Sequence, residues 1–124
     1  MIKTKDERIA ARAQELACEF IVRQGMKILD RNWKCGYGDM DIIALDGSTL
    51  VFCRVNFKQG DIRPISCSPK SVKEETLKLM NVYRTKSAVD HDRLRLDYVS
   101  IFTAKSGQKA HLHYIKEVAE PVNP

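Results

Sequence analysis

Four polar residues within a short stretch of the chain have types and spacing that could support chemistry. The stretch is GDMDIIALDGSTLVFCRVNFKQG, residues 38–60, and it carries Asp39, Asp41, Arg54 and Asn56. Metal-dependent phosphodiester hydrolysis needs two or more carboxylates converging on Mg²⁺, with a cation near the phosphate. The members of each pair are two residues apart, so on a β-strand they would share one face. The stretch could therefore be a site for phosphate chemistry, an inactive form of such a site, or an ordinary part of a β-sheet.

The four residues are expected in a β-hairpin. Two runs, 39–45 and 48–57, are rich in β-branched and aromatic types, and the Asp-Gly pair at 46–47 is a preferred two-residue turn. A turn closed there places Asp39 opposite Arg54 at the open end, on a polar patch. The other side of the hairpin is predicted to be core and carries Met40, Ile42, Ala44, Val51, Cys53 and Val55.

Two helices are predicted on either side of this hairpin. A capping box at Thr4 starts the first helix near Lys5, and Gly25 ends it. A second capping box at Ser71 starts a helix that runs to about Lys86. Apolar or small residues at helical spacing mark the buried faces, which comprise Ile9, Ala13, Leu16, Ala17, Phe20 and Ile21 in the first helix and Val72, Thr76, Leu79, Met80 and Tyr83 in the second.

The order of elements predicts the fold class. Further strands are expected over residues 26–33, 94–103 and 111–118, with a loop at 58–69. The order helix, three strands, helix, two strands (αβββαββ) indicates an α/β protein with a mixed central β-sheet flanked by helices. Residues 1–118 are expected to form a single domain, and 119–124 a loose tail.

Composition excludes several classes of protein. The chain has 124 residues, 44% hydrophobic and 30% charged, and no apolar run approaches the roughly 20 residues that span a bilayer. The N-terminus lacks a signal-peptide pattern, so a cytoplasmic protein with reduced cysteines is expected. The four cysteines form no C-x-x-C pair and the histidines fall late, which is not zinc spacing. Structural thiols and no cofactor are the expectation.

The charge favours an anionic partner. The formal net charge is +5 and the pI is about 9.1. Lysine and arginine gain affinity for nucleic acid by releasing counterions from phosphates. The alternative is a solvated basic surface, because the charges are spread along the chain without a dense run.

The sequence resembles a known family at these residues. RQGMKILDRNW followed by GDMDIIALDGSTLVF is similar to the YraN-type family of uncharacterised bacterial proteins, within the PD-(D/E)XK, or restriction-endonuclease-like, superfamily. The family pattern reads G-E-I-D-L-I, a D-G turn, then V-F-V-E-V-K. LRLDYVSIF, with Arg95 and Asp97, resembles the later R-F-D-V-V strand of the family. The resemblance runs from Ala13 to about Phe102 and implies a restriction-endonuclease-like fold with a metal-dependent nuclease site.

The chain departs from this pattern where the resemblance implies function. Asp41 matches the aspartate of the metal site, and Asp39 conservatively replaces the glutamate before it. Arg54 stands at the glutamate of E-V-K and Asn56 at its lysine, while Gln14 stands where the first helix usually has a glutamate. The neighbouring Glu15 points about 100° away around a helix. A guanidinium cannot ligate a metal and stays protonated, so the change at position 54 repels Mg²⁺.

Three hypotheses follow. The first is a catalytically inactive nuclease-like protein that binds DNA or RNA, in which Arg54 pairs with Asp41 or Asp39 in the cation's place, or merely balances exposed sheet carboxylates. Its phosphate contacts would be Lys34, Arg54, Lys58, Arg63 and Lys70. The second is a divergent Mg²⁺- or Mn²⁺-dependent nuclease using Asp39, Asp41 and migrated groups such as Lys58, Glu74 or Glu75. The third is a structural or protein-interaction role. The sequence leaves DNA against RNA, strandedness and oligomeric state open.

Overall fold

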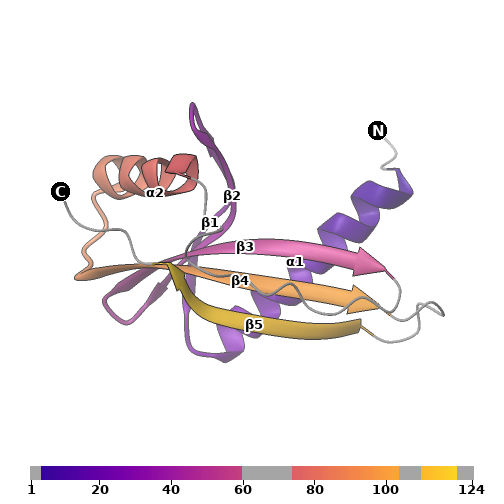
Figure 1. Cartoon of the computed structure of the whole chain (residues 1–124). Helices are drawn as coiled ribbons and strands as arrows, with labels where there is room; N and C mark the ends of the chain where they lie inside the picture. The colour runs from indigo at the N-terminus through magenta and orange to yellow at the C-terminus, as the bar shows by residue number, and fades with distance from the viewer. Residues whose placement is uncertain (1–3, 60–73, 104–109, 120–124) are drawn as a thin grey trace.

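The structure, a computed structural model, is an α/β protein whose seven elements follow the predicted order (Figure 1). It describes residues 4–59, 74–103 and 110–119. The elements are α1 (Lys5–Arg23), β1 (Lys27–Cys35), β2 (Gly38–Asp46), β3 (Thr49–Gln59), α2 (Glu74–Ser87), β4 (Arg93–Thr103) and β5 (Ala110–Ala119). Ala119, predicted to open the tail, is still in β5. The second capping box and most of the predicted 58–69 loop lie outside the described residues.

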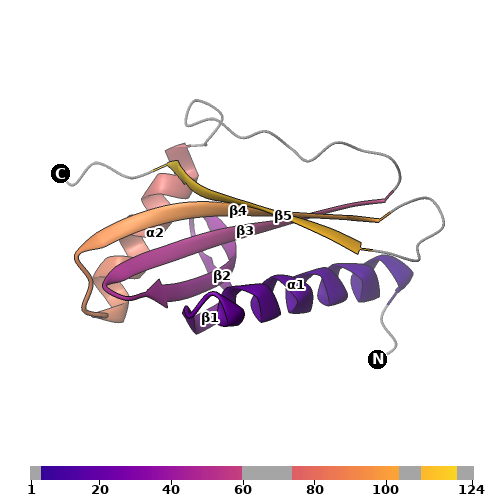
Figure 2. The same cartoon turned by 90° about the horizontal axis from the view of Figure 1, so that it is seen from below.

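The five strands form one mixed sheet in the order β1-β2-β3-β4-β5. All neighbours are antiparallel except β3 and β4, which are parallel and are separated in sequence by α2. α1 lies along one face of the sheet and α2 covers part of the other (Figure 2). This arrangement is compatible with the restriction-endonuclease-like fold.

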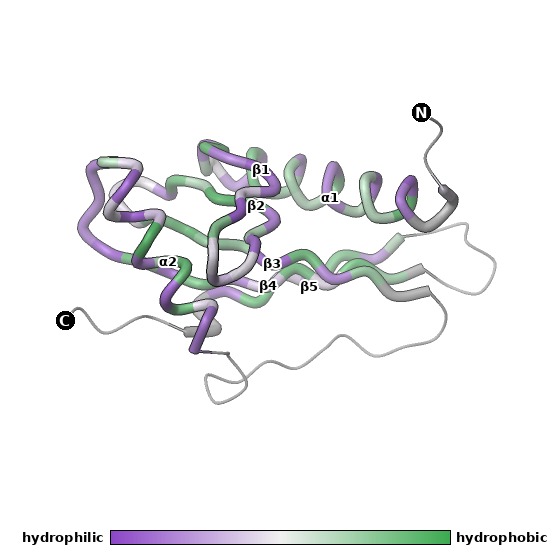
Figure 3. The backbone as a smooth tube through the Cα atoms, turned by 90° about the horizontal axis from the view of Figure 1, so that it is seen from above, coloured by the Kyte–Doolittle hydropathy of each residue, from purple (hydrophilic) through white to green (hydrophobic). Residues whose placement is uncertain are grey.

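Two hydrophobic clusters, one on each face, hold the layers together. Under α1, the buried side chains Ala13, Ala17 and Ile21 pack on Ile42 and Val51 and their neighbours. Hydrophobic and hydrophilic residues alternate along α1, as an amphipathic surface helix requires (Figure 3). The cluster under α2 contains Met40, Ile43, Leu50, Phe52, Leu79, Met80, Tyr83, Leu94 and Leu96. Most of the predicted buried residues of both helices are buried, while Ile9, Leu16 and Phe20 are half-buried and Val72 lies outside the described residues.

The predicted hairpin register is wrong by two residues. The turn is Gly47-Ser48, with Asp46 paired to Thr49, and not Asp46-Gly47. Gly47 has a φ of 60°, the conformation that a type II′ turn needs at its first central position. Keeping Asp46 in the strand lets its carboxylate pair with the buried Arg95 at 3.1 Å. A shift of two residues keeps each side chain of β3 on its predicted face.

The regular alternation of β2 also breaks at Asp41, which sequence periodicity did not predict. Met40 was expected beside Ile42 but packs under α2, on the opposite face. In the β1–β2 register Asn32 lies opposite Asp41, between the pairs Arg31–Ile42 and Trp33–Met40. Asn32 has a φ of 52°, a left-handed conformation that asparagine tolerates better than most residues. The β1–β2 pair is therefore irregular at Asn32 and Asp41.

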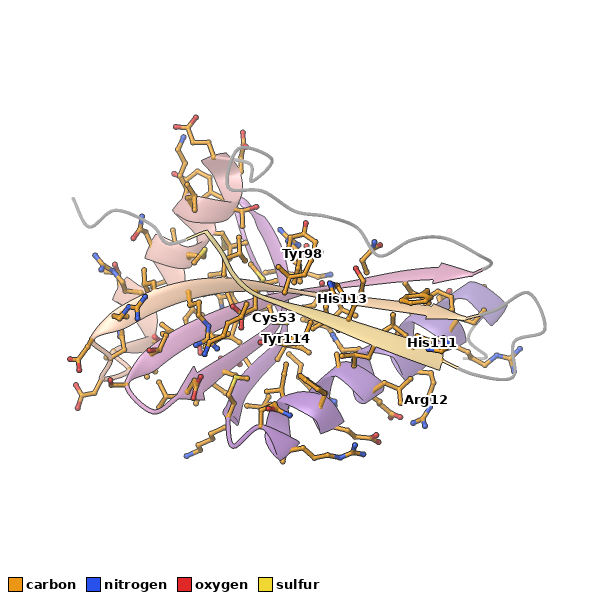
Figure 4. The ribbon with its side chains drawn as sticks, turned by 60° about the horizontal axis from the view of Figure 1, so that its bottom comes forward. Arg12, Cys53, Tyr98, His111, His113 and Tyr114 are labelled. Carbon is orange, nitrogen blue, oxygen red and sulfur yellow. The ribbon has the colours of Figure 1, made fainter. Side chains whose placement is uncertain are left out.

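A buried ion-pair network joins three strands, β2, β4 and β5, beneath α1. Arg95 is 3% exposed and donates to both carboxylate oxygens of Asp97, which is 0% exposed. Tyr114 in β5 donates to the same carboxylate, and burial raises the pKa of this phenol. Burial alone would lower the pKa of Arg95, but the hydrogen bonds and charge of Asp97 outweigh it and the pKa is raised. Figure 4 places Tyr114 and Cys53 on the side of the sheet that faces α1.

The end of α1 provides a test of backbone geometry. Gly25 has a φ of 90°, and a Cβ added there would meet nothing within 4 Å. Gly25→Ala is therefore expected to lower the free energy of unfolding by about 1–2 kcal/mol, through left-handed backbone strain alone. Gly36→Ala, where an added Cβ also meets nothing within 4 Å, is the matched control. Urea denaturation of both variants measures the difference, and equal stability would contradict this account.

Candidate functional site

The candidate site lies where β2 and β3 separate. Their ladder ends at the pair Ile42–Cys53, although both strands continue beyond it. Asp41, the next residue of β2, has an Oδ2 that accepts a hydrogen bond of 2.8 Å from the Val55 backbone N–H. The carboxylate thus takes over a backbone donor that the ladder no longer pairs.

Arg54 forms an ion pair across this opening. Its Nη1 lies 3.1 Å from Asp39 Oδ1, and the two side chains are 26% and 60% exposed. The predicted pairing of Arg54 with Asp41 or Asp39 is thus observed with Asp39. Because it is partly exposed, the pair contributes no more than about 1 kcal/mol to stability. Its consequence is chemical, because the positive charge of Arg54 already neutralises the carboxylate of Asp39.

Gln14 connects α1 to the same opening. Its Nε2 donates to Asn32 Oδ1 at 2.8 Å and to the Asp41 carbonyl at 3.1 Å. Asn32 Nδ2 donates back to Gln14 Oε1 at 3.3 Å. The two amides therefore hold each other and the kinked segment of β2 in place. Glu15, on the neighbouring face of α1, pairs instead with Arg12.

A cavity of about 340 Å³ opens beside Asp41 and Gln14. Three alanines of α1 form one wall, and Val55 and Phe57 form part of another. The full lining is Ala10, Ala11, Ala13, Gln14, Asn32, Asp41, Val55 and Phe57. The structure thus brings the predicted residues Gln14 and Asp41 together in one hollow. Asn32 joins them and was missed by sequence reasoning, because a polar residue within a strand gives no signal of a kink.

The donor set of this hollow does not fit Mg²⁺. Asp41 lines the cavity as its one carboxylate, and an oxygen of that group already accepts from Val55. Gln14 is uncharged and Asp39 is neutralised by Arg54. A hydrolytic Mg²⁺ site requires octahedral oxygen ligands and two or more converging carboxylates, and the lining of this hollow supplies one. Within the described ranges, no three His, Cys, Asp or Glu side chains gather as a metal site would require.

The other predicted residues are distributed around the opening. Asn56 follows Arg54 in β3 and is half-buried, while the exposed Lys34 lies opposite Asp39 in β1. Lys58 lies in β3, but its side chain is outside the described part, as are Arg63 and Lys70. The proposed substitutes Glu74 and Glu75 are exposed on α2, where Glu74 lies 3.7 Å from Lys78. Neither glutamate lines the cavity beside Asp41.

Burial raises the pKa of the Asp41 carboxyl, and the nearby Asp39 adds a smaller rise. The Val55 hydrogen bond and the Arg54 charge oppose these effects without cancelling them. Between the unfolded and folded pKa values the folded state binds more protons, so this group's contribution to stability falls as pH rises through that window. The charged form of Asp41 therefore costs folding stability at neutral pH.

Asp41→Asn is accordingly expected to be at least as stable as the parent protein at pH 7. The amide retains an oxygen that can accept from Val55 but carries no charge to desolvate. The gain should vanish below pH 3.9, the approximate pKa of aspartate in an unfolded chain, where both states are protonated. Urea denaturation at pH 7 and pH 3, with the exposed Asp90→Asn as control, measures this. A clear loss of stability at pH 7 would contradict it.

Comparisons with known proteins identify the family of the chain. The sequence profile described as "Uncharacterised protein family UPF0102" matches residues 13–101. The chain belongs to this family. A UPF0102 protein of Pseudoalteromonas translucida is 31% identical over 104 residues, covering 82% of each chain. One from Paenarthrobacter aurescens is 32% identical over 108 residues, 82% of this chain and 86% of the relative. A Thermotoga maritima UPF0102 protein is 45% identical over 53 residues, 43% of this chain and 49% of its own.

UPF0102 is the YraN family, so the predicted resemblance is confirmed. The likeness was expected from Ala13 to about Phe102, and the matched range agrees with this to one residue. Among the described residues, no helix is long and apolar enough to cross a membrane. Of the cysteines expected to be structural, Cys18 and Cys53 are buried, Cys35 is half-buried, and Cys67 lies outside the described residues.

Proposed function

We propose that this UPF0102 protein binds nucleic acid without cleaving it, on a nuclease-like fold whose metal site is replaced by an ion pair. The observation that carries the proposal is the 3.1 Å contact between Arg54 and Asp39. Arg54 stands where the resemblance implies a metal-ligating glutamate. A guanidinium stays protonated at any relevant pH and repels a divalent cation from this opening. The carboxylate of Asp41 is held by Val55.

The same substitution removes negative charge that would repel phosphate from the opening. Lys34 and Arg54 flank Asp39, one through the β1–β2 register and the other through its ion pair. With the carboxylate of Asp41 the local charges cancel, so the attraction for phosphate rests on the net charge of +5 of the whole chain. Cations of this kind position a protein on the phosphate backbone.

Salt dependence of binding is the direct test. If the five predicted cations all contact phosphates, the association constant should fall by about 100- to 500-fold between 50 and 200 mM salt. Fluorescence anisotropy with labelled single-stranded and duplex oligonucleotides measures this fall. Absence of binding at 50 mM salt, or binding that salt does not weaken, would overturn the proposal.

Lys34 offers a specific version of this test. Lys34→Gln should reduce the magnitude of the slope of log K against log salt by about 0.7–0.9, the contribution of one phosphate contact. Lys27→Gln is the matched control, because Lys27 is also exposed but begins β1, whereas Lys34 lies near its end. Equal slopes for the two variants would remove Lys34 from the interface.

A further inference from the structure

The side of the sheet that faces away from α1 carries a regular array of polar and aromatic side chains on β3, β4 and β5. Register places Arg54 beside Tyr98 and Asn56 beside Ser100. The outer face, as we call this array, comprises Arg54, Asn56, Tyr98, Ser100, Phe102, His111, His113 and Ile115. Alternate residues of these strands, such as Val55, Val99 and Tyr114, point to the core under α1. Figure 4 shows Tyr98 and His113 on this outer side.

Within the described ranges, no helix covers the outer face. α2 packs on Leu50, Phe52, Leu94 and Leu96, which precede the array in β3 and β4. The arrowheads of β3 and β4 in Figure 1 lie at the end of the sheet away from α2. His111 and His113 of β5 are exposed. Among the described residues, this end of the face is thus a surface of three strands without a second core over it.

Two polar atoms near the middle of the outer face have no partner. Asn56 Nδ2 and Ser100 Oγ are both buried without a hydrogen bond, and they belong to neighbouring residues in the β3–β4 register. Ser100 is 4% exposed and is flanked on its own strand by Tyr98 and Phe102. An amide NH₂ group can only donate hydrogen bonds, and a hydroxyl group is able to donate one. Both atoms are therefore suited to acceptor groups of a ligand, provided that the flanking rings of Tyr98 and Phe102 move aside to admit it.

Aromatic rings surround this pair of donors. Phe102 and His111 stack with ring centroids 5.2 Å apart and an interplanar angle of 20°. No residue of the outer face is acidic, and Asp39 at its edge is already paired with Arg54. The face thus combines flat π-surfaces, unsatisfied donors and a cation. A nucleotide offers the complement of each: a base ring, acceptor atoms on its edge, and a phosphate.

We propose that the outer face binds single-stranded nucleic acid. Bases stack on Phe102, His111 and Tyr98, while their acceptor groups or the adjoining phosphates meet Asn56, Ser100 and Arg54. Stacking on a protein ring requires an exposed base, which a single strand presents and a duplex hides. This inference rests on the proposed function and narrows it to one form of nucleic acid.

Anisotropy with fluorescein-labelled 12-nucleotide oligo-dT and oligo-U, against a 12-base-pair dT·dA duplex at 50 mM salt, tests it. A single strand should bind at least about tenfold tighter than the duplex, because only the strand can use the rings. Phe102→Leu keeps the apolar bulk and should weaken single-strand binding by about 5- to 150-fold. His111→Ala, at an exposed position, should also weaken it and serves if Phe102→Leu fails to fold. Tyr37→Leu, on a ring 49% exposed at the β1–β2 turn, should bind within about twofold of the parent.

The outcomes separate this inference from the proposed function. Salt-sensitive binding that favours the duplex, or that Phe102→Leu and His111→Ala leave unchanged, would overturn the binding of single strands by the outer face and leave the proposed function standing. Binding that depends on Tyr37 would likewise overturn it, by moving the site to the hairpin turn. Failure of every oligonucleotide to bind would overturn both proposals together.

Discussion

Replacing Asp97 with alanine is expected to destabilise the protein by about 3–5 kcal/mol, because it leaves a buried guanidinium without its main partner. Asp97 is 0% exposed and accepts from Arg95 and Tyr114, while Arg95 is 3% exposed. Among the described residues, the remaining charged partner of Arg95 is Asp46, which lies 3.1 Å away with a side chain 36% exposed. That contact cannot offset the lost hydrogen bonds.

Urea denaturation at pH 7 measures the loss. Asp90→Ala, at an exposed position, is the control and should change stability by less than about 0.5 kcal/mol. The double variant Arg95→Met/Asp97→Leu should cost less than Asp97→Ala alone, because it removes both charges together. A double variant that is less stable than the single one would contradict the view that the cost lies in the stranded charge.

Arg54→Glu is expected to create a metal-binding site that the parent protein lacks. The change replaces the ion pair with Asp39 by a third carboxylate near Asp39 and Asp41, so the apo variant should be less stable than the parent. Mn²⁺ would relieve this repulsion. At a concentration 100 times the dissociation constant it would stabilise the variant by about 2.7 kcal/mol, on the order of 10 °C in the thermal midpoint.

The midpoint is measured with EDTA and with millimolar Mn²⁺ for both proteins. Arg54→Gln is the matched control, because it removes the cation without adding a ligand, and it should show no such shift. The parent protein should also be unaffected by Mn²⁺. A shift in the parent as large as in Arg54→Glu would support the alternative of a divergent metal-dependent nuclease using Asp39 and Asp41.

Much of this fold could be predicted because local signals and burial agree. The cap at Thr4, the glycine after α1 and the helical spacing of Leu79, Met80 and Tyr83 all lead to the observed elements. The hairpin register could not be predicted in the same way. Local turn preference favours Asp-Gly, but the buried Arg95 requires the Asp46 carboxylate within the strand. The deciding contact joins residues far apart in sequence.

The sequence predicted which residues form the candidate site better than it predicted how they are arranged. Sequence reasoning placed Arg54 beside Asp39, which the structure shows, though through a hairpin register that the structure corrects. It did not predict that Asp41 turns toward Gln14 and α1, because this depends on the left-handed Asn32 opposite it. Periodicity assumes a regular strand, and here the strand is irregular at the residue that matters.

A nuclease assay shows whether a protein with the Arg54–Asp39 ion pair can cleave nucleic acid. Supercoiled plasmid, single-stranded DNA and structured RNA are incubated with Mg²⁺ or Mn²⁺ and the parent protein, Asp41→Ala, or Arg54→Glu/Asn56→Lys. We expect the parent to cleave none of them with either metal, and the double variant reports whether the scaffold can still position a substrate. Metal-dependent cleavage by the parent that Asp41→Ala abolishes would contradict this expectation, because the ion pair of Arg54 would then coexist with a working metal site.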